Sequence, residues 1–268
     1  INTNQKIKLK NILNKYENLN NEKEILYGKA FLYYFKDEFL KSIEICNKLI
    51  NYNEFKYAIQ DLLASNLKKQ KNFLETLKIY KQKLKEKKNH LIFYNIGLLF
   101  SELGRTKIAH YYFDKCKNIK SNDYTNLHSL SLCKLKLKDL KNGFELYENR
   151  WKKNEPIKKK FQHIKYPNSL NEITKKKIII WDEQGLGDTL QFSRFVIDLL
   201  KFTDQITFVV NAKLSQILSS LNKNVLVTSY ENLVSENFDY QLPLCSLPKY
   251  LNIDCTDKIN FFTLNNKN

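Results

Sequence analysis

One stretch of the sequence has residue types and a spacing that could support chemistry. It extends from Lys177 to Phe195 and reads KIIIWDEQGLGDTLQFSRF. An apolar run rich in β-branched residues precedes two glycines one residue apart, and an acid then opens a helical pattern. This order is typical of a strand, a tight turn and a helix N-terminus. Such turns often bind phosphate groups, because backbone N–H groups at a helix N-terminus point at the ligand.

The details of this turn argue against the usual nucleotide cradles. A dinucleotide site needs a third glycine where this chain has Leu190, and an acid after the second strand where it has Asn211. Asp188 would also place negative charge where a pyrophosphate binds. No Gly-Lys-Ser/Thr sequence is present after the turn, so the turn is not a P-loop. Asp188 and Gln191 instead have the spacing of a capping box, which predicts that Asp188 is the N-cap of the helix.

The residues around this turn alternate between strand-like and helix-like patterns. We expect strands at 177–181, 205–211 and 225–229, helices at 188–201 and 213–221, and a short apolar segment at 240–244. Strands and helices that alternate with short loops predict βαβ units and a parallel sheet. Ligands of open α/β sheets bind at the carboxyl ends of the strands, where the turn at 185–189 would lie.

Upstream of this region, small residues recur at a nearly constant spacing. Four of them are 34, 33 and 34 positions apart: Ala30, Ala64, Gly97 and Ser131. Each is followed twelve positions later by a second small residue: Ser42, Thr76, Ala109 and Gly143. A larger residue stands four positions further on: Cys46, Tyr80, Phe113 and Tyr147. This period predicts antiparallel helix pairs at about 22–51, 56–86, 90–119 and 123–153, with half a unit at 5–18.

The helical period is lost after Trp151, where prolines and lysines mark a boundary. We therefore expect a repeat array of about four and a half units at 1–153, a linker at 154–176 and an α/β half domain at 177–268. Trp151 is expected to pack the last helix against the α/β half domain. Arg150 is expected to pair with Glu148 or with that same domain.

The array resembles the tetratricopeptide repeat (TPR), and its third unit matches best, with small, aromatic and turn residues at the family's positions: Gly97, Phe100, Gly104, Ala109 and Phe113. The run at 183–195, together with 147–151 and 238–248, resembles the bacterial TPR glycosyltransferase-like proteins. Their catalytic region is similar to the ADP-heptosyltransferases and, more distantly, to O-linked N-acetylglucosamine transferase. The resemblance implies an α-helical TPR solenoid followed by a Rossmann-like α/β half domain, the N-terminal half of a GT-B fold.

The same resemblance implies roles for individual residues. Asp188 would be the catalytic residue, a general base that accepts the proton of the attacking hydroxyl. The alternative is that Asp188 only caps its helix. Substrate binding is expected of the residues around it: Gln184, Gly185, Gly187, Thr189, Gln191 and Arg194. Arg194 could bind an anion or pair with Asp198 one turn on. We expect no metal site and no cofactor.

The resemblance and the lack of methionine also predict that the chain is a fragment. In the GT-B family the C-terminal half supplies most of the nucleotide-sugar site. The donor is therefore expected to bind only when that half is present, and this fragment is expected to be inactive.

The composition of the chain argues against several other classes of function. The formal net charge is +17, but only three of the 45 basic residues are Arg, and Lys is spread along every expected helix. This favours solvated helix faces over a nucleic-acid interface. The five cysteines include no Cys-x-x-Cys pair, which predicts buried, reduced thiols. No apolar run approaches the roughly 20 residues of a membrane span, and the first residues lack a secretion signal, so we expect a cytoplasmic protein.

These patterns support two hypotheses of function. The first is a TPR glycosyltransferase-like protein that transfers a sugar from a nucleotide-sugar donor to a protein or glycan acceptor, with a protein or peptide bound in the TPR groove. The second is a non-enzymatic TPR scaffold for protein–protein interaction, whose α/β module is degenerate.

Overall fold

The computed structural model describes residues 23–52, 56–152, 160–234 and 237–254. The chain divides into two compact units, Ile1–Ser121 and Asn122–Asn268, called unit 1 and unit 2. The half repeat expected at 5–18 lies outside the described residues. The limits of these two units differ from the domain limits that we expect from the sequence repeat. Those domain limits stay a prediction.

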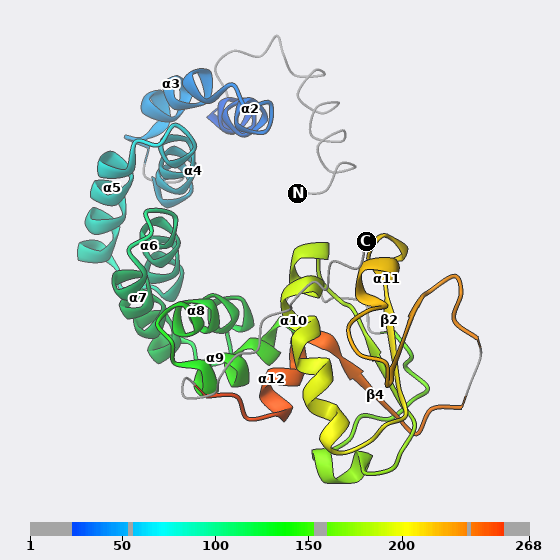
Figure 1. The fold of residues 1–268 in the computed structure, drawn as a ribbon. Helices are drawn as coiled ribbons and strands as arrows, with labels where there is room; N and C mark the ends of the chain where they lie inside the picture. The colour runs from blue at the N-terminus through cyan, green and yellow to red at the C-terminus, as the bar shows by residue number, and fades with distance from the viewer. Residues whose placement is uncertain (1–22, 53–55, 153–159, 235–236, 255–268) are drawn as a thin grey trace. The chain divides into compact units, whose positions relative to one another are not determined.

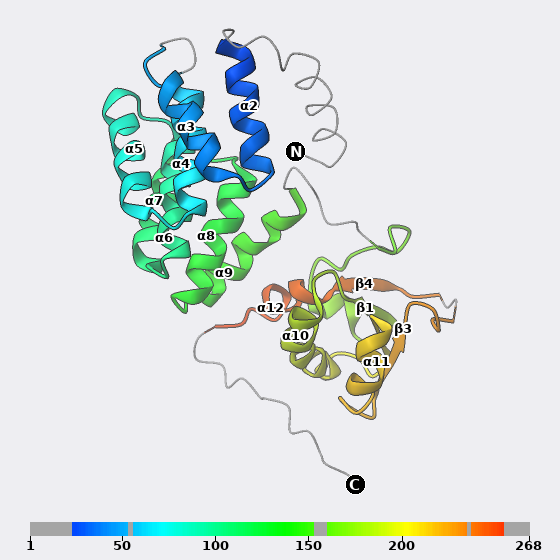
Figure 2. The ribbon, with the colours of Figure 1, turned by 90° about the horizontal axis from the view of Figure 1, so that it is seen from above.

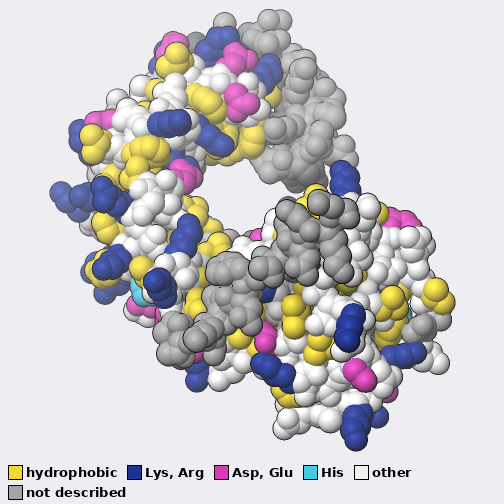
Figure 3. Space-filling model, in the orientation of Figure 1, with side chains coloured by type: hydrophobic (Ala, Val, Ile, Leu, Met, Phe, Trp, Pro, Cys, Tyr) yellow, Lys and Arg dark blue, Asp and Glu magenta, His cyan; other side chains and the backbone are white. Residues whose placement is uncertain are grey.

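Unit 1 is built from antiparallel helix pairs that form a TPR-like helical solenoid (Figure 1). The pairs are α2 (Lys23–Phe35) with α3 (Phe39–Leu49), α4 (Lys56–Lys69) with α5 (Phe73–Glu86), and α6 (His90–Glu102) with α7 (Thr106–Ile119). Their bounds agree with the helix pairs predicted from the period of the small residues. Lys and Arg side chains are scattered over the face drawn in Figure 3, with Asp and Glu side chains among them.

The small residues of the repeat are buried where the two helices of a pair cross. Ala30, Ala64 and Ala109 have no exposed surface. Gly97 marks the closest approach, because a Cβ added there would lie 2.5 Å from a ring carbon of Phe113. The Phe113 ring therefore occupies the space that any larger residue at position 97 would need. This close approach explains why the third unit has glycine at this position.

The turns between paired helices share one left-handed residue, which recurs with the period of the repeat. Positive φ angles occur at Asp37 (61°), Lys71 (60°), Gly104 (67°) and Lys138 (66°). In each turn the next N–H donates to the carbonyl five residues earlier, as Arg105 N does to Phe100 O at 2.9 Å. This is the hydrogen bond of a Schellman-type helix end. Glycine adopts this backbone without strain, whereas other residues do so at a cost.

Unit 2 begins with the fourth predicted helix pair, α8 (Tyr124–Lys136) and α9 (Leu140–Tyr147), followed by the short helix η2 (Glu148–Lys152). A parallel sheet comes next, with β1 (Ile178–Trp181), β2 (Ile206–Val210), β3 (Val225–Ser229) and β4 (Tyr240–Pro243) in the order β3-β2-β1-β4 (Figure 2). Helix α10 (Leu186–Asp198) and the turn η4 (Leu199–Lys201) connect β1 to β2. Helix α11 (Ala212–Leu218) connects β2 to β3. The predicted parallel sheet is confirmed.

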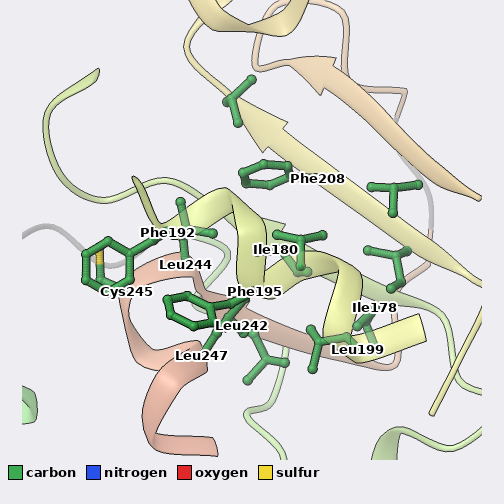
Figure 4. Close-up of a cluster of buried hydrophobic side chains, with 14 of the residues drawn as sticks. Ile178, Ile180, Phe192, Phe195, Leu199, Phe208, Leu242, Leu244, Cys245 and Leu247 are labelled. Atoms are coloured by element: carbon green, nitrogen blue, oxygen red, sulfur yellow. The ribbon is translucent and has the colours of Figure 1, made fainter. Parts of the chain in front are cut away.

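The two faces of the sheet are covered differently. One face packs against α10 and the residues after β4, and its core contains Ile178, Ile180, Phe208, Phe192 and Phe195 (Figure 4). The elements after β4 are η5 (Leu244–Ser246) and α12 (Leu247–Tyr250). The second face, with Ile179 and Val209, is covered by the segment that begins at Phe161 and by residues after β3. The turn η3 (Leu170–Ile173) precedes β1.

The fourth helix pair shares the hydrophobic core of the sheet. Phe144 and Tyr147 on α9 belong to the same buried cluster as Ile178 and Ile180 on β1. The Phe144 ring meets the Phe192 ring of α10 edge-on, at 6.2 Å between centroids. This shared core is the reason why α8 and α9 belong to unit 2, although their sequence belongs to the repeat.

We predict that Gly97→Ala lowers the free energy of unfolding by about 1 to 3 kcal/mol, because the added methyl group overpacks the contact with Phe113. Chemical denaturation followed by circular dichroism measures the change. The double variant with Phe113→Leu should recover part of the loss, since the smaller side chain makes room. Equal losses in the single and double variants would show that the Phe113 ring does not set the limit.

We also predict opposite effects at two equivalent turn positions. Gly104→Ala should destabilise unit 1 by about 1 kcal/mol through its backbone alone, since nothing lies within 4 Å of the added Cβ. Lys71→Gly should leave the midpoint of denaturation unchanged or raise it, because it removes the same strain. A drop in stability for Lys71→Gly as large as that for Gly104→Ala would contradict this explanation.

Candidate functional site

A pocket of about 490 Å³ lies in unit 2 at the carboxyl ends of three neighbouring strands. Asp182 follows β1 directly, Asn211 follows β2 and Tyr230 follows β3. The pocket is lined by residues of these three loops and by one lysine: Lys160, Asp182, Glu183, Gln184, Gly185, Leu186, Asn211 and Tyr230. The carboxyl edge of a parallel sheet is the position where α/β proteins commonly bind their ligands.

Asp182 organises the wall of the pocket on the β2 and β3 side. Its Oδ1 accepts hydrogen bonds from the Tyr230 hydroxyl at 2.6 Å and from Lys160 Nζ at 3.2 Å, and its Oδ2 accepts from the backbone N–H of Asn211 at 2.9 Å. The Lys160 ammonium also lies 3.5 Å from the centre of the Tyr230 ring. Burial and the neighbouring Asp182 carboxylate raise the pKa of Tyr230, so its hydroxyl stays protonated and donates. Asp182 thus joins the ends of β1, β2 and β3.

A second network holds the opposite side of the turn and is centred on Arg150. This side chain is 1% exposed, and its guanidinium donates to Glu148, to Glu183 Oε1 at 2.8 Å and to Ser246 Oγ at 2.6 Å. Glu183, with a side chain that is 0% exposed, also accepts from the backbone N–H of Cys245 at 3.2 Å. The expectation that Arg150 pairs with Glu148 or with the α/β domain is confirmed for both partners.

The charges of this second network stabilise one another. Burial alone lowers the pKa of Arg150, but the Glu148 and Glu183 carboxylates outweigh it and leave that pKa raised. Burial raises the pKa of Glu183, and the Arg150 guanidinium and the Cys245 N–H oppose that rise. Removing Arg150 would leave the Glu183 carboxylate buried without a counter-charge, which is far more costly than losing an exposed ion pair.

Aromatic rings surround the two networks. The Arg150 guanidinium lies 4.5 Å from the centre of the Trp151 ring, and this ring lies 6.0 Å from the Trp181 ring on β1. Trp181 Nε1 donates to Gln241 Oε1 on β4 at 2.9 Å. The prediction that Trp151 packs the last helix against the α/β domain is confirmed.

Helix α10 begins earlier than the sequence pattern predicted. Its first residue is Leu186, its N-cap is Gly185, and the Gly185 carbonyl accepts from Thr189 N at 3.0 Å. The prediction that Asp188 is the N-cap of a capping box with Gln191 is therefore wrong. Gly185 has the extended backbone that an N-cap needs, so the helix starts there, and Asp188 lies within the first turn.

Two of the seven predicted site residues line the pocket, namely Gln184 and Gly185. Asp188 is exposed. It lies at the rim of the pocket, because a Cβ added at the lining residue Gly185 would lie 3.7 Å from Asp188 Oδ2. Gly187 is exposed in the same turn, and Gln191 is exposed one turn further along.

The other two predicted residues point elsewhere. Thr189 is buried, and its hydroxyl donates to the Gly185 carbonyl at 3.2 Å. The Arg194 guanidinium lies 4.9 Å from the centre of the Phe195 ring, and burial lowers the pKa of Arg194. Asp198, the partner suggested for Arg194, pairs with Lys201 at 3.1 Å. The roles suggested for these residues stay predictions.

Sequence reasoning did not select Lys160, Asp182, Asn211 and Tyr230 as site residues. A usable signal existed for three of them, because polar residues directly after consecutive parallel strands meet at one edge of the sheet. Lys160 precedes the sheet in the sequence and carried no such signal. Within the described ranges, no three His, Cys, Asp or Glu side chains lie close enough together to hold a metal ion. Nor is any helix described by the structure long and apolar enough to cross a membrane.

Comparisons with known proteins give a likeness in fold only. No protein-family model and no curated protein matches the sequence. A tetratricopeptide repeat protein from Parabacteroides merdae ATCC 43184 is 20% identical over 49% of this chain, with a TM-score of 0.44. The APC/C hetero-tetramer Cut9–Hcn1 gives 15% identity over 56% of this chain, with a TM-score of 0.50. A mutant of the Thermobaculum terrenum O-GlcNAc transferase gives 11% identity over 79%, with a TM-score of 0.44.

The alignments cover only part of each matched protein. They span 53% of the Parabacteroides protein, 30% of the Cut9–Hcn1 chain and 42% of the transferase. The likeness to the Cut9–Hcn1 structure reaches the level at which two chains share a fold over the aligned part. It agrees with the helical repeat that the helix pairs of the chain themselves display.

We predict that Arg150→Met destabilises unit 2 by about 3 to 5 kcal/mol at pH 7, because Glu183 stays buried without its counter-charge. The loss should be smaller at pH 5. Without Arg150, the pKa of Glu183 in the folded state rises further above its unfolded value, so the folded state takes up a proton as the pH falls and recovers stability. Thermal denaturation at both pH values measures this.

The double variant Arg150→Met with Glu183→Gln serves as the control for this prediction. It removes both charges, so its stability should differ less between pH 5 and pH 7 than that of the single variant. A single variant whose stability loss is the same at both pH values would contradict the assignment of the effect to Glu183.

Proposed function

We propose that this chain is the acceptor-side portion of a TPR glycosyltransferase of GT-B architecture, with the α/β part of unit 2, expected at 177–268, as its Rossmann-like half domain. The observation that carries the proposal is the pocket at the carboxyl ends of β1, β2 and β3. The parallel strand order β3-β2-β1-β4 supports it, because it corresponds to the central strands of a doubly wound sheet. The resemblance of the run at 183–195 to the glycosyltransferase-like family supports the reaction class.

The proposed reaction places Asp188 beside the acceptor. The acceptor hydroxyl oxygen bonds to the anomeric carbon of the donor sugar, and the bond from that carbon to the nucleoside diphosphate breaks. The Asp188 carboxylate accepts the proton of the hydroxyl. Its exposure at the rim suits this role, since the side chain is accessible to a bound acceptor. Gln184 and Gly185 would contact the acceptor, and the donor would bind to the second half of the GT-B enzyme.

A second candidate function is favoured by the helical repeats of unit 1. The Cut9–Hcn1 structure is a hetero-tetramer, so a chain with a similar fold can serve assembly with a partner protein. On this proposal, unit 1 binds a protein or peptide and the pocket of unit 2 carries out no transfer. The two candidates differ in whether function depends on the residues around the pocket.

Asp188→Asn in the protein encoded by the complete reading frame tests the first proposal. We expect transfer from a panel of nucleotide sugars to fall by about 10²- to 10⁴-fold, the usual contribution of a general base. Asp198→Asn is the matched control on the same helix, and its transfer rate should stay unchanged. Unchanged turnover in Asp188→Asn would overturn the catalytic role. Absence of any transfer in the wild-type protein would favour the scaffold.

A further inference from the structure

We propose that the pocket of unit 2 binds an uncharged sugar ring and discriminates against sugars that carry an anionic group. This inference rests on the proposed function, since it names the class of acceptor that the same site would take. It is carried by the balance of charges around the pocket and by the polar groups that stay available on its walls.

Among the described residues, the charged side chains around the pocket sum to a negative excess, while the N-termini of α10 and α11, at Gly185 and Asn211, bring partial positive charge to its lining. Lys160 is paired with Asp182 in the wall at 3.2 Å, so these two compensate each other. Behind the turn, Arg150 is shared between two carboxylates, Glu148 and Glu183, which leaves one negative charge in excess. Asp188 adds another at the rim, beside Gly185. A ligand with a carboxylate or phosphate would enter against this excess, because like charges repel.

The two carboxylates in the wall are already engaged. Both oxygens of Asp182 accept hydrogen bonds within the protein, and the Glu183 side chain has no exposed surface. Lys160 Nζ donates to both the carbonyl and the carboxylate of Asp182. The two carboxylates therefore have little capacity left for a ligand, whereas Lys160, with a side chain that is 39% exposed, keeps one N–H beyond these two hydrogen bonds.

Amide groups supply the remaining polar capacity of the pocket. The Gln184 side chain forms no hydrogen bond with the residues that the structure describes, and it lines the pocket. Asn211 uses its Oδ1 to accept from Lys213 N, which leaves the two Nδ2 protons for another acceptor. Neutral amides pair well with hydroxyl groups, which both donate and accept. A pocket of about 490 Å³ has room for a sugar ring and a neighbouring group.

The test compares two sugars that differ only at C6, methyl glucoside with its neutral hydroxymethyl group and the methyl glycoside of glucuronate with its carboxylate, by calorimetry or saturation-transfer NMR at low salt. We expect the glucoside to bind the wild-type chain at millimolar concentrations and the glucuronate to bind about fivefold more weakly. Asp188→Asn should reduce this ratio to about twofold or less, while the matched control Asp198→Asn keeps the wild-type ratio. Gln184→Ala should weaken glucoside binding severalfold, with its folding checked by circular dichroism.

Three results would overturn the inference. They are glucuronate binding as tight as glucoside binding, a ratio that does not respond to Asp188→Asn, and no binding of either sugar while a serine-containing peptide binds and is lost in Gln184→Ala. Because sugar binding is measured without a donor, it can succeed even where transfer fails. Failure of the proposed function and failure of this inference are therefore distinguishable.

Discussion

Most parts of unit 2 are connected through one buried arginine, Arg150, which requires carboxylates around it. A guanidinium stays protonated in proteins, so Arg150 can be buried only where carboxylates and hydrogen-bond acceptors surround it. Its partners come from three places in the sequence: Glu148 beside it, Glu183 after β1 and Ser246 after β4. One side chain thus links the end of the fourth repeat to two adjacent strands. This explains why the last helix pair packs as part of the α/β unit.

The same constraint shapes the candidate site. Glu183 pairs with Arg150 on one side of the turn, whereas Asp182 accepts hydrogen bonds from Lys160 and Tyr230 on the other. These contacts of Asp182 and Glu183 fix the backbone that leads into α10, and this backbone forms the pocket wall. Asp182 and Glu183 form their contacts within the protein, whereas the neutral side chain of Gln184 lines the pocket.

Unit 1 depends on a different constraint, the close crossing of paired helices. Each pair needs a small residue at the crossing and a left-handed residue in the turn, and both recur with the same period. Only Gly104 among the four turn residues avoids the backbone cost of this conformation, so the other units accept strain to keep the geometry. The repeat therefore tolerates variation in residue type but not in spacing.

The sequence alone determined the elements that depend on local periodicity. The spacing of small residues predicted the helix pairs, and apolar runs separated by helical patterns predicted the parallel sheet, because both patterns repeat within or between neighbouring segments. Of the two glycines in the turn, Gly185 lines the pocket. The N-cap of α10 was predicted three residues too late, at Asp188 and not at Gly185, because an acid with the spacing of a capping box outweighed the glycine.

Only the tertiary structure decided which distant side chains meet. Lys160 approaches Asp182 and Tyr230 because the segment that precedes the sheet crosses its carboxyl end, and no local pattern records that path. Arg150 contacts both Glu183 and Ser246, and Ser246 lies 96 positions further along the chain. Burial strengthens these ion pairs, so Asp182 and Glu183 stabilise the folded chain. Sequence patterns report periodicity, whereas desolvation and charge compensation arise only once the chain has folded.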